Sequence, residues 1–283
     1  MDYCASPYRH ARRETRPVTV GEVVVGGGEP IVQQSMITCS TLDTDACVEQ
    51  SMALVEVGCQ IVRITAQTKK YAANLESIVA GIRARGSNVP VVADIHFKPD
   101  AALEAVKWCE MVRVNPGNYA DSKKFITREY TDEQYTAELE RIEEQFAPLV
   151  EECKLRGRAL RIGTNHGSLS DRIMNRFGDT PLGMVESALE FARIARDLDF
   201  HNFKFSMKSS NPKVMIECYR LLAARLEELG ADWDYPLHLG VTEAGEGEDG
   251  RIKSAVGIGT LLFAFGIGPC VALGLYLVGK IFN

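Results

Sequence analysis

The chain has 283 residues, of which 46% are hydrophobic and 25% are charged, and this length is sufficient to bury one large core. Its formal net charge of −6 argues against a general nucleic-acid-binding protein, because such proteins neutralise phosphates with a surplus of lysine and arginine. Any anion site must therefore be local, built from a few basic side chains.

The first sixteen residues predict a polar extension, 1–16, that precedes the folded domain. This segment is mildly basic and has no apolar stretch of the kind that a secretory signal needs, so no export is indicated. An organellar transit peptide is the alternative, although Asp2 and Glu14 are acidic. The following Gly26-Gly27-Gly28 lacks the rest of a phosphate-loop pattern, and we interpret it as a hairpin turn.

Short β-branched segments then alternate with longer segments of helical period, which is typical of parallel βαβ units. The predicted strands are Ile31–Met36, Ile61–Thr65, Val91–Ile95, Met111–Val114, Ala159–Ile162, Asn202–Ser206 and Leu237–Val241. The predicted helices are Asp45–Val57, Asn74–Arg85, Asp100–Cys109, Thr131–Arg156, Leu182–Asp197 and Pro212–Glu228. Seven such units predict the α/β class and a TIM-type (β/α)₈ barrel that lacks one recognisable strand.

Two polar segments interrupt this alternation. The longest connection, 115–159, carries an acidic helix whose charged residues we expect to form a solvated outer face. The segment TEAGEGEDGRIKS, 242–254, follows the seventh predicted strand and is rich in glycine and acidic residues. We expect it to be a mobile loop of the kind that carries function in barrels.

After Leu262 the sequence changes to an almost uncharged segment, 263–283. This apolar tail permits three interpretations: a strand that fills the vacant eighth position, sequence foreign to the barrel from a shifted or unspliced reading frame, or a membrane anchor. Pro269 and four glycines weaken a continuous helix, so a membrane anchor is the least favoured. The predicted barrel domain is therefore 17–262.

Eight cysteines are present, none in a Cys-x-x-Cys pair and none at metal-ligand spacing from a histidine. We expect reduced thiols in a reducing compartment, packed as small apolar side chains. They are Cys4, Cys39, Cys47, Cys59, Cys109, Cys153, Cys218 and Cys270.

Three predicted strands share one feature: an arginine interrupts an apolar run near the carboxyl end. The motifs are V-R-I-T at Arg63, V-R-V-N at Arg113 and L-R-I-G at Arg161. An unpaired charge is costly to bury, and barrel active sites are built at the carboxyl ends of the strands. Guanidinium groups bind phosphate oxygens in bidentate fashion, so the three arginines predict a phosphate or diphosphate site.

Other polar residues follow the same strand ends, and together they predict a polar pocket for a small, oxygen-rich ligand. They are Asp94, His96, Asn115, Asn165, His166, Ser168, Lys208, Thr242 and Glu243.

Longer motifs carry a resemblance to a known family. VRITAQTKK, VADIHF, VRVNPGNYAD, RALRIGTNHGSLSDRIM, HNFKFSMKSSNP and YPLHLGVTEAGEGEDGRIKSAVGIGTLL resemble the 4-hydroxy-3-methylbut-2-enyl diphosphate synthase family, in the longer form of plastids and some bacteria. The resemblance spans about residues 13–262.

The resemblance implies reductive ring opening of 2-C-methyl-D-erythritol 2,4-cyclodiphosphate in the methylerythritol phosphate route to isoprenoids. Ferredoxin or flavodoxin would supply electrons through a 4Fe-4S cluster. The implied clamp for the diphosphate is Arg63, Arg113, Arg161 and Lys208, with hydrogen bonds from Asn115, Asn165, His166, Ser168 and Thr242. The implied catalytic residues are Asp94, His96 and Glu243, with Glu243 handling the proton near the leaving hydroxyl.

The sequence departs from the family after GIGTLL, where an eighth strand and a domain with three cluster-binding cysteines are expected. Cys270 stands alone, so no metal ligand is assigned and this chain is predicted to be inactive by itself. The resemblance also implies a homodimer in a plastid or a bacterial cytoplasm, with no nucleic acid bound and a membrane partner disfavoured. Two alternatives remain: a pterin-binding barrel transferase resembling dihydropteroate synthase, and a membrane-tethered diphosphate-binding protein.

Overall fold

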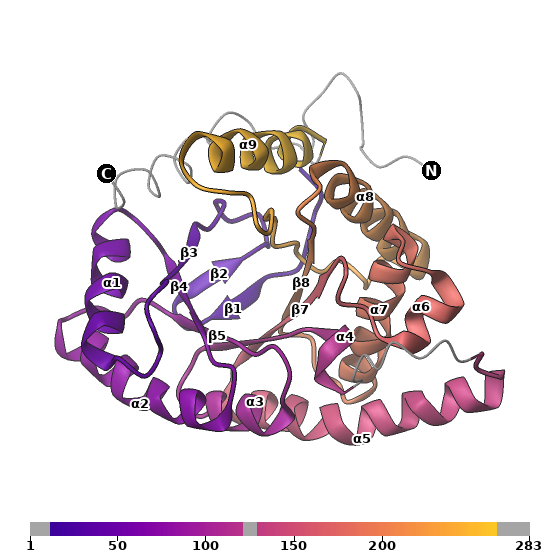
Figure 1. Ribbon diagram of the computed structural model, residues 1–283, viewed down its shortest axis with the longest axis horizontal. Coiled ribbons are helices and arrows are strands. Elements are labelled where there is room, and N and C mark those ends of the chain that lie inside the picture. The colour runs from indigo at the N-terminus through magenta and orange to yellow at the C-terminus, as the bar shows by residue number, and fades with distance from the viewer. Residues whose placement is uncertain (1–11, 121–128, 265–283) are drawn as a thin grey trace.

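The computed structural model describes residues 12–120 and 129–264, and its centre is a curved parallel sheet with helices along its outer side (Figure 1). Six strands pair in the order β3-β4-β5-β6-β7-β8, every pair parallel. Neighbouring strands in the sheet are therefore also consecutive in the sequence, as expected for a singly wound barrel.

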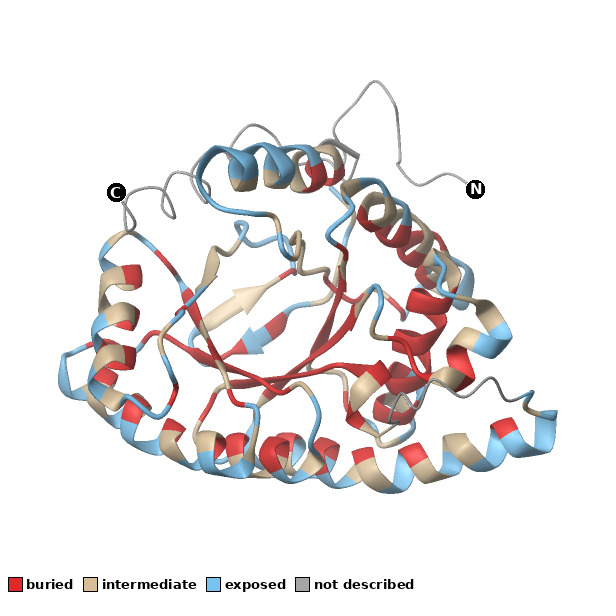
Figure 2. Cartoon of the chain, in the orientation of Figure 1, coloured by how far each residue is buried: buried red, intermediate tan, exposed pale blue. Residues whose placement is uncertain are grey.

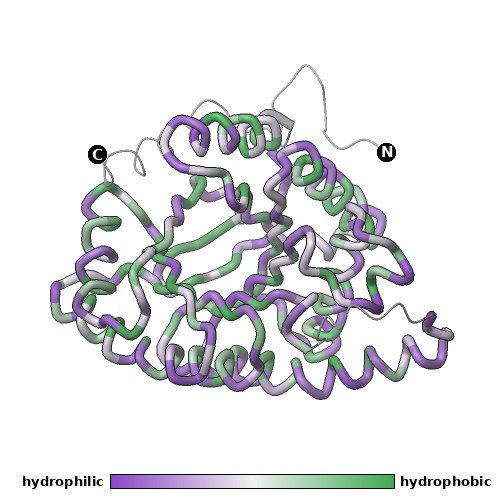
Figure 3. Tube along the Cα trace, viewed as in Figure 1, coloured by the Kyte–Doolittle hydropathy of each residue, from purple (hydrophilic) through white to green (hydrophobic). Residues whose placement is uncertain are grey.

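The strands of this sheet are short, and all except the edge strand β3 are mostly buried, because helices cover one face and facing strands cover the other (Figure 2). Their bounds are β3 Gln34–Met36, β4 Ile61–Thr65, β5 Val91–Asp94, β6 Met111–Val114, β7 Ala159–Asn165 and β8 Phe203–Lys208. The predicted positions of these six strands are confirmed, with ends that differ by up to three residues. In the tube of Figure 3, hydrophilic and hydrophobic residues alternate along the helices, as expected for helices with one face on the sheet and one toward solvent.

The helices lie outside the sheet, and several begin with the caps that the sequence indicates. Asp43 accepts a hydrogen bond from Ala46 at the start of α1, and Asn211 with Pro212 opens α8. Their bounds are α1 Thr44–Glu56, α2 Lys69–Ala84, α3 Pro99–Ala105, α5 Asp132–Arg156, α7 Pro181–Asp197 and α8 Pro212–Leu229. Two shorter helices were not predicted: α4 Pro116–Tyr119 and α6 Asp171–Phe177.

Helix α5 confirms the expectation of a solvated acidic face. Thr131 and Gln134 form a capping box at its start, and Gly157, with φ of 61°, ends it. Its buried residues repeat at helical spacing and include Ile142 and Phe146, whereas most of its charged residues are exposed.

A β-hairpin, β1 Val18–Val20 and β2 Val23–Val25, covers the amino-terminal end of the sheet. Val18 and Val20 pack with the buried starts of four strands: Ile61, Val92, Met111 and Ala159. The prediction that Gly26–Gly28 forms a hairpin turn is wrong, because the turn lies at 21–22 and these glycines follow β2. All three have positive φ, and a Cβ at Gly26 would lie 2.5 Å from the carbonyl oxygen of Arg16.

The seventh predicted strand, Leu237–Val241, is not a strand, because only Leu237 bridges to Phe205 of β8. The prediction that 242–254 is a loop throughout is also corrected. Helix α9, Gly247–Ala264, begins inside that segment and packs against α8 (Figure 1). Acidic Glu248 and Asp249 lie in its first turn, where they favour a helix start.

Helix α9 continues two residues into the predicted apolar tail, and the rest of that tail lies outside the described residues, as do residues 1–11 of the predicted extension. Among the helices that the structure does describe, none combines the length and apolar character needed to cross a membrane.

Candidate functional site

The carboxylate of Asp94 lies among three guanidinium groups at the carboxyl end of the sheet. Its Oδ1 is 2.9 Å from Arg113 Nη1 and 4.0 Å from Arg161 Nη2, and its Oδ2 is 3.4 Å from Arg63 Nε. Burial raises the pKa of Asp94, but Arg113, His96, Arg63 and Arg161 together hold that pKa well below its usual range. Asp94 is therefore ionised. We call these four residues, Arg63, Asp94, Arg113 and Arg161, the arginine cluster.

The positions of these side chains follow from the pairing of the strands. Asp94 on β5 is in register with Arg113 on β6, which is in register with Arg161 on β7. Residues in register on parallel strands point to the same side of the sheet, so the three side chains meet inside the barrel. Arg63 on β4 approaches from the neighbouring strand and donates from Nη2 to the Met36 sulfur at 2.6 Å.

Arg113 has the most hydrogen bonds within the arginine cluster. Besides Asp94, its Nη2 donates to the carbonyl oxygen of Gly163 at 2.8 Å and to Oδ1 of Asn165 at 3.0 Å. A Cβ at position 163 would lie 2.8 Å from Arg113 Nε and 2.6 Å from Ser206 Oγ, so glycine is required for this close approach. The guanidinium of Arg113 is therefore fixed by protein groups on two sides.

Arg161 is fully buried but only partly paired. Its Nη1 lies 3.3 Å from Nε2 of His238, while its Nε and Nη2 have no hydrogen-bond partner in the described structure. Burial and the nearby Arg63 lower its pKa to about 9, although Asp94 opposes the shift. Unpaired buried donors of a charged group are costly, which indicates that they are available to a ligand.

Lys208 ends β8 in register with Asn165, at the mouth of the barrel. Burial and the positive charges of Arg63, Arg161 and Arg113 lower the pKa of Lys208 well below its usual range, with only Asp94 opposing. His96 lies at the same mouth, with Nε2 3.5 Å from Asp94 Oδ2 and a side chain that is 35% exposed. The structure thus brings together seven predicted residues: Arg63, Asp94, His96, Arg113, Arg161, Asn165 and Lys208.

Four other predicted residues lie around this group without a hydrogen bond or ion pair from their side chains to the arginine cluster in the described part of the chain. Asn115 Oδ1 caps α4 by accepting from Gly117, and His166 Nε2 lies 3.7 Å from Asp179. The described bonds of Ser168 and Thr242 are made by their backbone amides, which donate to Asn165 and Ser209.

Glu243, the predicted proton-handling residue, has an exposed side chain and likewise makes no described contact with the arginine cluster. Its φ of 49° places it in the left-handed region, which is uncommon for glutamate. Such backbone geometry costs about 1–2 kcal/mol and often occurs at functional sites.

Two basic residues near the arginine cluster were missed at the sequence level: the buried Lys204 on β8 and the partly buried His238 after α8. Lys204 is in register with Arg161 and 2% exposed. Burial and the Arg161 charge lower the pKa of His238 well below its usual range, so the ring is neutral and Nε2 can accept from Arg161. For Lys204, the alternation F-K-F-S-M-K in β8 could have indicated its place, because it puts Lys204, Ser206 and Lys208 on one face of the strand.

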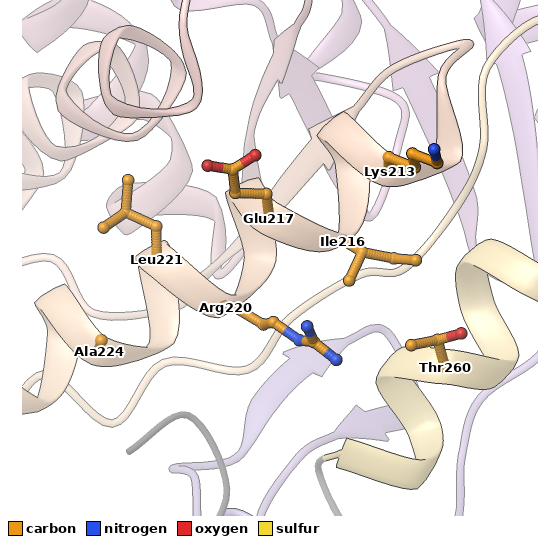
Figure 4. A pocket seen from close by; sticks show the side chains of 7 residues that line it. All are labelled: Lys213, Ile216, Glu217, Arg220, Leu221, Ala224 and Thr260. Carbon is orange, nitrogen blue, oxygen red and sulfur yellow. The ribbon is translucent and has the colours of Figure 1, made fainter. Parts of the chain in front are cut away.

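The structure also has a groove on the outside of the barrel between α8 and α9 (Figure 4). It is lined by Lys213, Ile216, Glu217, Arg220, Leu221, Ala224 and Thr260. None of these residues belongs to the arginine cluster, so the groove and the cluster are separate features. None of the residues that the sequence predicts for the site lines this groove.

Within residues 12–120 and 129–264, no three histidine, cysteine, aspartate or glutamate side chains come together as metal ligands. The six described cysteines are free, and five of them are buried. What the mouth offers is a concentration of positive charge: three arginines and one carboxylate give a formal charge of +2 before either lysine is counted. This arrangement is suited to binding a multiply charged anion.

Comparisons with known proteins agree with this geometry. The model of the family described as GcpE TIM-barrel domain matches residues 15–276. A 4-hydroxy-3-methylbut-2-en-1-yl diphosphate synthase (flavodoxin) from Akkermansia muciniphila is 65% identical over 96% of this chain and 46% of its own length. The chloroplastic synthase (ferredoxin) from Oryza sativa is 56% identical over 96% of this chain and 36% of its own length. The chain thus spans less than half the length of these relatives.

Among solved structures, dihydropteroate synthase from Thermus thermophilus aligns with a TM-score of 0.54 over 95% of this chain and all of that one, at 17% identity. At this identity the likeness shows a shared fold alone. The family match covers most of the chain and includes every residue of the arginine cluster. The chain belongs to the GcpE TIM-barrel domain family, and its fold is the α/β TIM barrel.

Proposed function

We propose that this chain binds 2-C-methyl-D-erythritol 2,4-cyclodiphosphate at the mouth of its barrel, as the substrate-binding part of a 4-hydroxy-3-methylbut-2-enyl diphosphate synthase. The complete enzyme would open the cyclic diphosphate reductively. The observation that carries the proposal is the arginine cluster, in which three guanidinium groups share the single carboxylate of Asp94. The names of the relatives supply the reaction.

The charge of the cluster fits the charge of this ligand. Each phosphoryl group of the cyclic diphosphate carries one negative charge at neutral pH, which matches the formal +2 of the three arginines and Asp94. The unpaired Nε and Nη2 of Arg161 and the amine of Lys208 supply donors for the phosphoryl oxygens. Asn165 adds an amide beside Arg113.

We assign Asp94 a role in positioning the arginines, because a carboxylate with a strongly lowered pKa is a poor proton donor. His96 is a better candidate to face the carbon skeleton, since its ring is partly exposed at the mouth. Glu243 remains our candidate for the proton that accompanies departure of the hydroxyl group. Hydrogen bonds to the rim of the ligand are assigned to Asn115, His166, Ser168 and Thr242.

The described residues do not fit a 4Fe-4S cluster, because they offer no group of converging thiols. No step of the reaction is therefore assigned to such a cluster in this chain. We propose that the chain is inactive alone and that its relatives' additional length supplies the redox part. Ferredoxin or flavodoxin as the electron donor, a homodimeric assembly and a plastid or bacterial compartment also remain proposals.

Calorimetric titration tests the proposed function directly. The chain is expected to bind the cyclic diphosphate and to show no heat of binding with a pterin diphosphate, the ligand expected for a dihydropteroate synthase-like barrel. Arg161→Met is expected to weaken binding, because the most weakly paired guanidinium is lost. Arg225→Met on the outer face of α8 is the matched control, since Arg225 pairs with Glu228 and Glu186, which lie outside the arginine cluster. Equal affinity in wild type and Arg161→Met would contradict the assignment.

A further inference from the structure

We propose that Lys204 is a positioning residue for Arg161, that above neutral pH it gains its positive charge when an anion occupies the arginine cluster, and that ligand binding there takes up a proton. The inference rests on the proposed function, since it needs an anion at the mouth. It assigns a role to a lysine that has no part in the phosphate clamp described above.

The first observation is the position of Lys204 in the sheet. Asp94, Arg113, Arg161 and Lys204 occupy successive registers on β5, β6, β7 and β8, so they form one row across four strands. Lys204 stands at the end of this row beside Arg161. It also lies four residues before Lys208 on β8, on the side of the cluster away from the mouth.

The second observation is that the ammonium group of Lys204 has no partner. The side chain is 2% exposed, and no hydrogen bond or ion pair of Lys204 occurs in the described parts of the chain. An ammonium group without a counter-charge is disfavoured in a side chain that is almost completely buried, so the equilibrium of the Lys204 amine shifts toward its neutral form in the ligand-free protein.

The neighbours of Lys204 explain why nothing compensates its charge. The only carboxylate of the row is Asp94, which already pairs with Arg113 at 2.9 Å. The other titratable or charged groups facing this region come from β4, β6, β7, β8, α8 and the segment after α8: Arg63, Arg113, Arg161, Lys208, Tyr219 and His238. Burial and then the Arg161 charge lower the pKa of Lys204 to about 7.

Anion binding changes the charge around Lys204 and thereby raises its pKa. Two phosphoryl groups at the mouth bring negative charge close to Arg161 and offset the repulsion that Lys204 experiences, so its pKa rises and it takes up a proton. The charged Lys204 then repels the Arg161 guanidinium from the inner side while the ligand attracts it from the outer side. Both forces hold the free Nε and Nη2 of Arg161 toward the ligand.

The test is calorimetry of the wild-type chain with the cyclic diphosphate, in pairs of buffers that differ in ionisation enthalpy. This ligand keeps a constant charge between pH 6.5 and 8.5, so proton uptake reports on the protein. We expect Lys204 to contribute close to one proton at pH 8 and an affinity about 20-fold weaker at pH 8.5 than at pH 6.5, from a free pKa of about 7. Lys208, whose pKa is also lowered, adds its own uptake to this contribution.

Three variants separate the lysines. Lys204→Met is expected to lose the proton and the part of the pH dependence that belong to Lys204, and Lys213→Met, an exposed lysine of α8, is expected to behave as wild type. Lys208→Met is expected to bind more weakly but to retain the uptake that belongs to Lys204. Equal uptake in wild type and Lys204→Met, or uptake lost in Lys208→Met alone, overturns the inference.

Two further measurements keep the test decisive. If Lys204→Met does not fold, we use an NMR titration of lysine-labelled wild type, with Lys204→Arg to assign the signal of Lys204. A Lys204 signal that titrates near pH 7, and whose pKa rises when the ligand is added, supports the inference. The absence of such a signal refutes it.

Inorganic pyrophosphate is the second probe. Binding of pyrophosphate without binding of the cyclic diphosphate contradicts the proposed function, while the wild-type and Lys204→Met difference in uptake still decides the role of Lys204. Binding of neither overturns both.

Discussion

Arg113 and Asp94 face each other from adjacent strands, in register and 2.9 Å apart, so the guanidinium that we propose as a phosphate ligand already holds a carboxylate. The pair is buried, with 3% of each residue exposed. Asp94 is also shared with Arg63 and Arg161, which leaves the three arginines with more positive charge than one carboxylate can balance. The pairing thus orients the arginines without neutralising them.

Replacement of Arg113 by methionine tests this dual role. We expect the affinity for the cyclic diphosphate to fall by about 1–3 kcal/mol, the range for loss of a charge-assisted contact. We also expect the free energy of unfolding to fall by about 3–5 kcal/mol, because Asp94 loses its nearest partner in a buried site. Calorimetry and urea denaturation measure the two effects, and unchanged affinity in a folded variant would remove Arg113 from the clamp.

Asp94→Asn gives a pH-dependent prediction. The folded-state pKa of Asp94 is held well below its usual range, so its carboxylate stabilises the fold above the unfolded-state value of about 3.9 and loses this effect as pH falls toward the folded-state value. We expect the variant to be less stable than wild type by a constant amount from pH 8 to pH 5, with a smaller difference below pH 4. Asp199→Asn, at an exposed ion pair with Lys154, is the control and should cost at most about 1 kcal/mol. A difference that grows on acidification would contradict the prediction.

Glu190→Gln tests a second buried pair, outside the mouth. Arg172 on α6 donates to both carboxylate oxygens of Glu190 on α7, at 2.8 and 2.7 Å, and Tyr135 of α5 donates to the same carboxylate. We expect the free energy of unfolding to fall by about 3–5 kcal/mol, since a buried guanidinium loses its counter-charge. Glu138→Gln, at an i,i+3 ion pair on the surface of α5, is the comparison. Its free energy of unfolding, measured by denaturation, should differ from that of wild type by less than about 1 kcal/mol. Similar losses of unfolding free energy in both variants would contradict the prediction that the buried pair of Arg172 and Glu190 contributes more than a surface pair.

Two glycines offer a matched steric test. A Cβ at Gly117 in α4 would lie 1.7 Å from the backbone oxygen of Ser168, whereas a Cβ at Gly259 in α9 meets no atom within 4 Å. Gly117→Ala should displace the segment that carries His166 and Ser168, lowering stability by about 1–3 kcal/mol and weakening ligand binding. Gly259→Ala should raise stability by up to about 1 kcal/mol, because alanine favours a helix. Urea denaturation of both variants checks the opposite signs.

The sequence indicated the barrel and the arginines because both depend on local patterns. Buried parallel strands appear as short apolar runs, and an arginine within such a run is conspicuous. The sharing of Asp94 was not predictable, because it depends on which residues of neighbouring strands lie in register. Lys204 was missed for the same reason, since only the register shows that it stands beside Arg161.

Other elements were missed because local signals compete. The acidic and glycine-rich start of α9 is typical of a loop, yet packing against α8 stabilises a helix there. The segment after Leu237 looks like a strand from its apolar residues, but it makes one bridge to β8 and then leaves the sheet. The short helix α4 was also missed, although Asn115 and Pro116 at its start are typical of a helix N-terminus.

The hairpin of β1 and β2 affects how water and protons reach the interior of the barrel. By packing Val18 and Val20 onto the starts of four strands, it closes the end of the barrel opposite the mouth with apolar side chains. This apolar packing separates the row of Asp94, Arg113, Arg161 and Lys204 from solvent on one side, whereas the mouth, where His96 is 35% exposed, is open to solvent. A diphosphate bound at the mouth would cover the side of this row that is open to solvent, so we expect the proton taken up by Lys204 to exchange more slowly while the ligand stays bound.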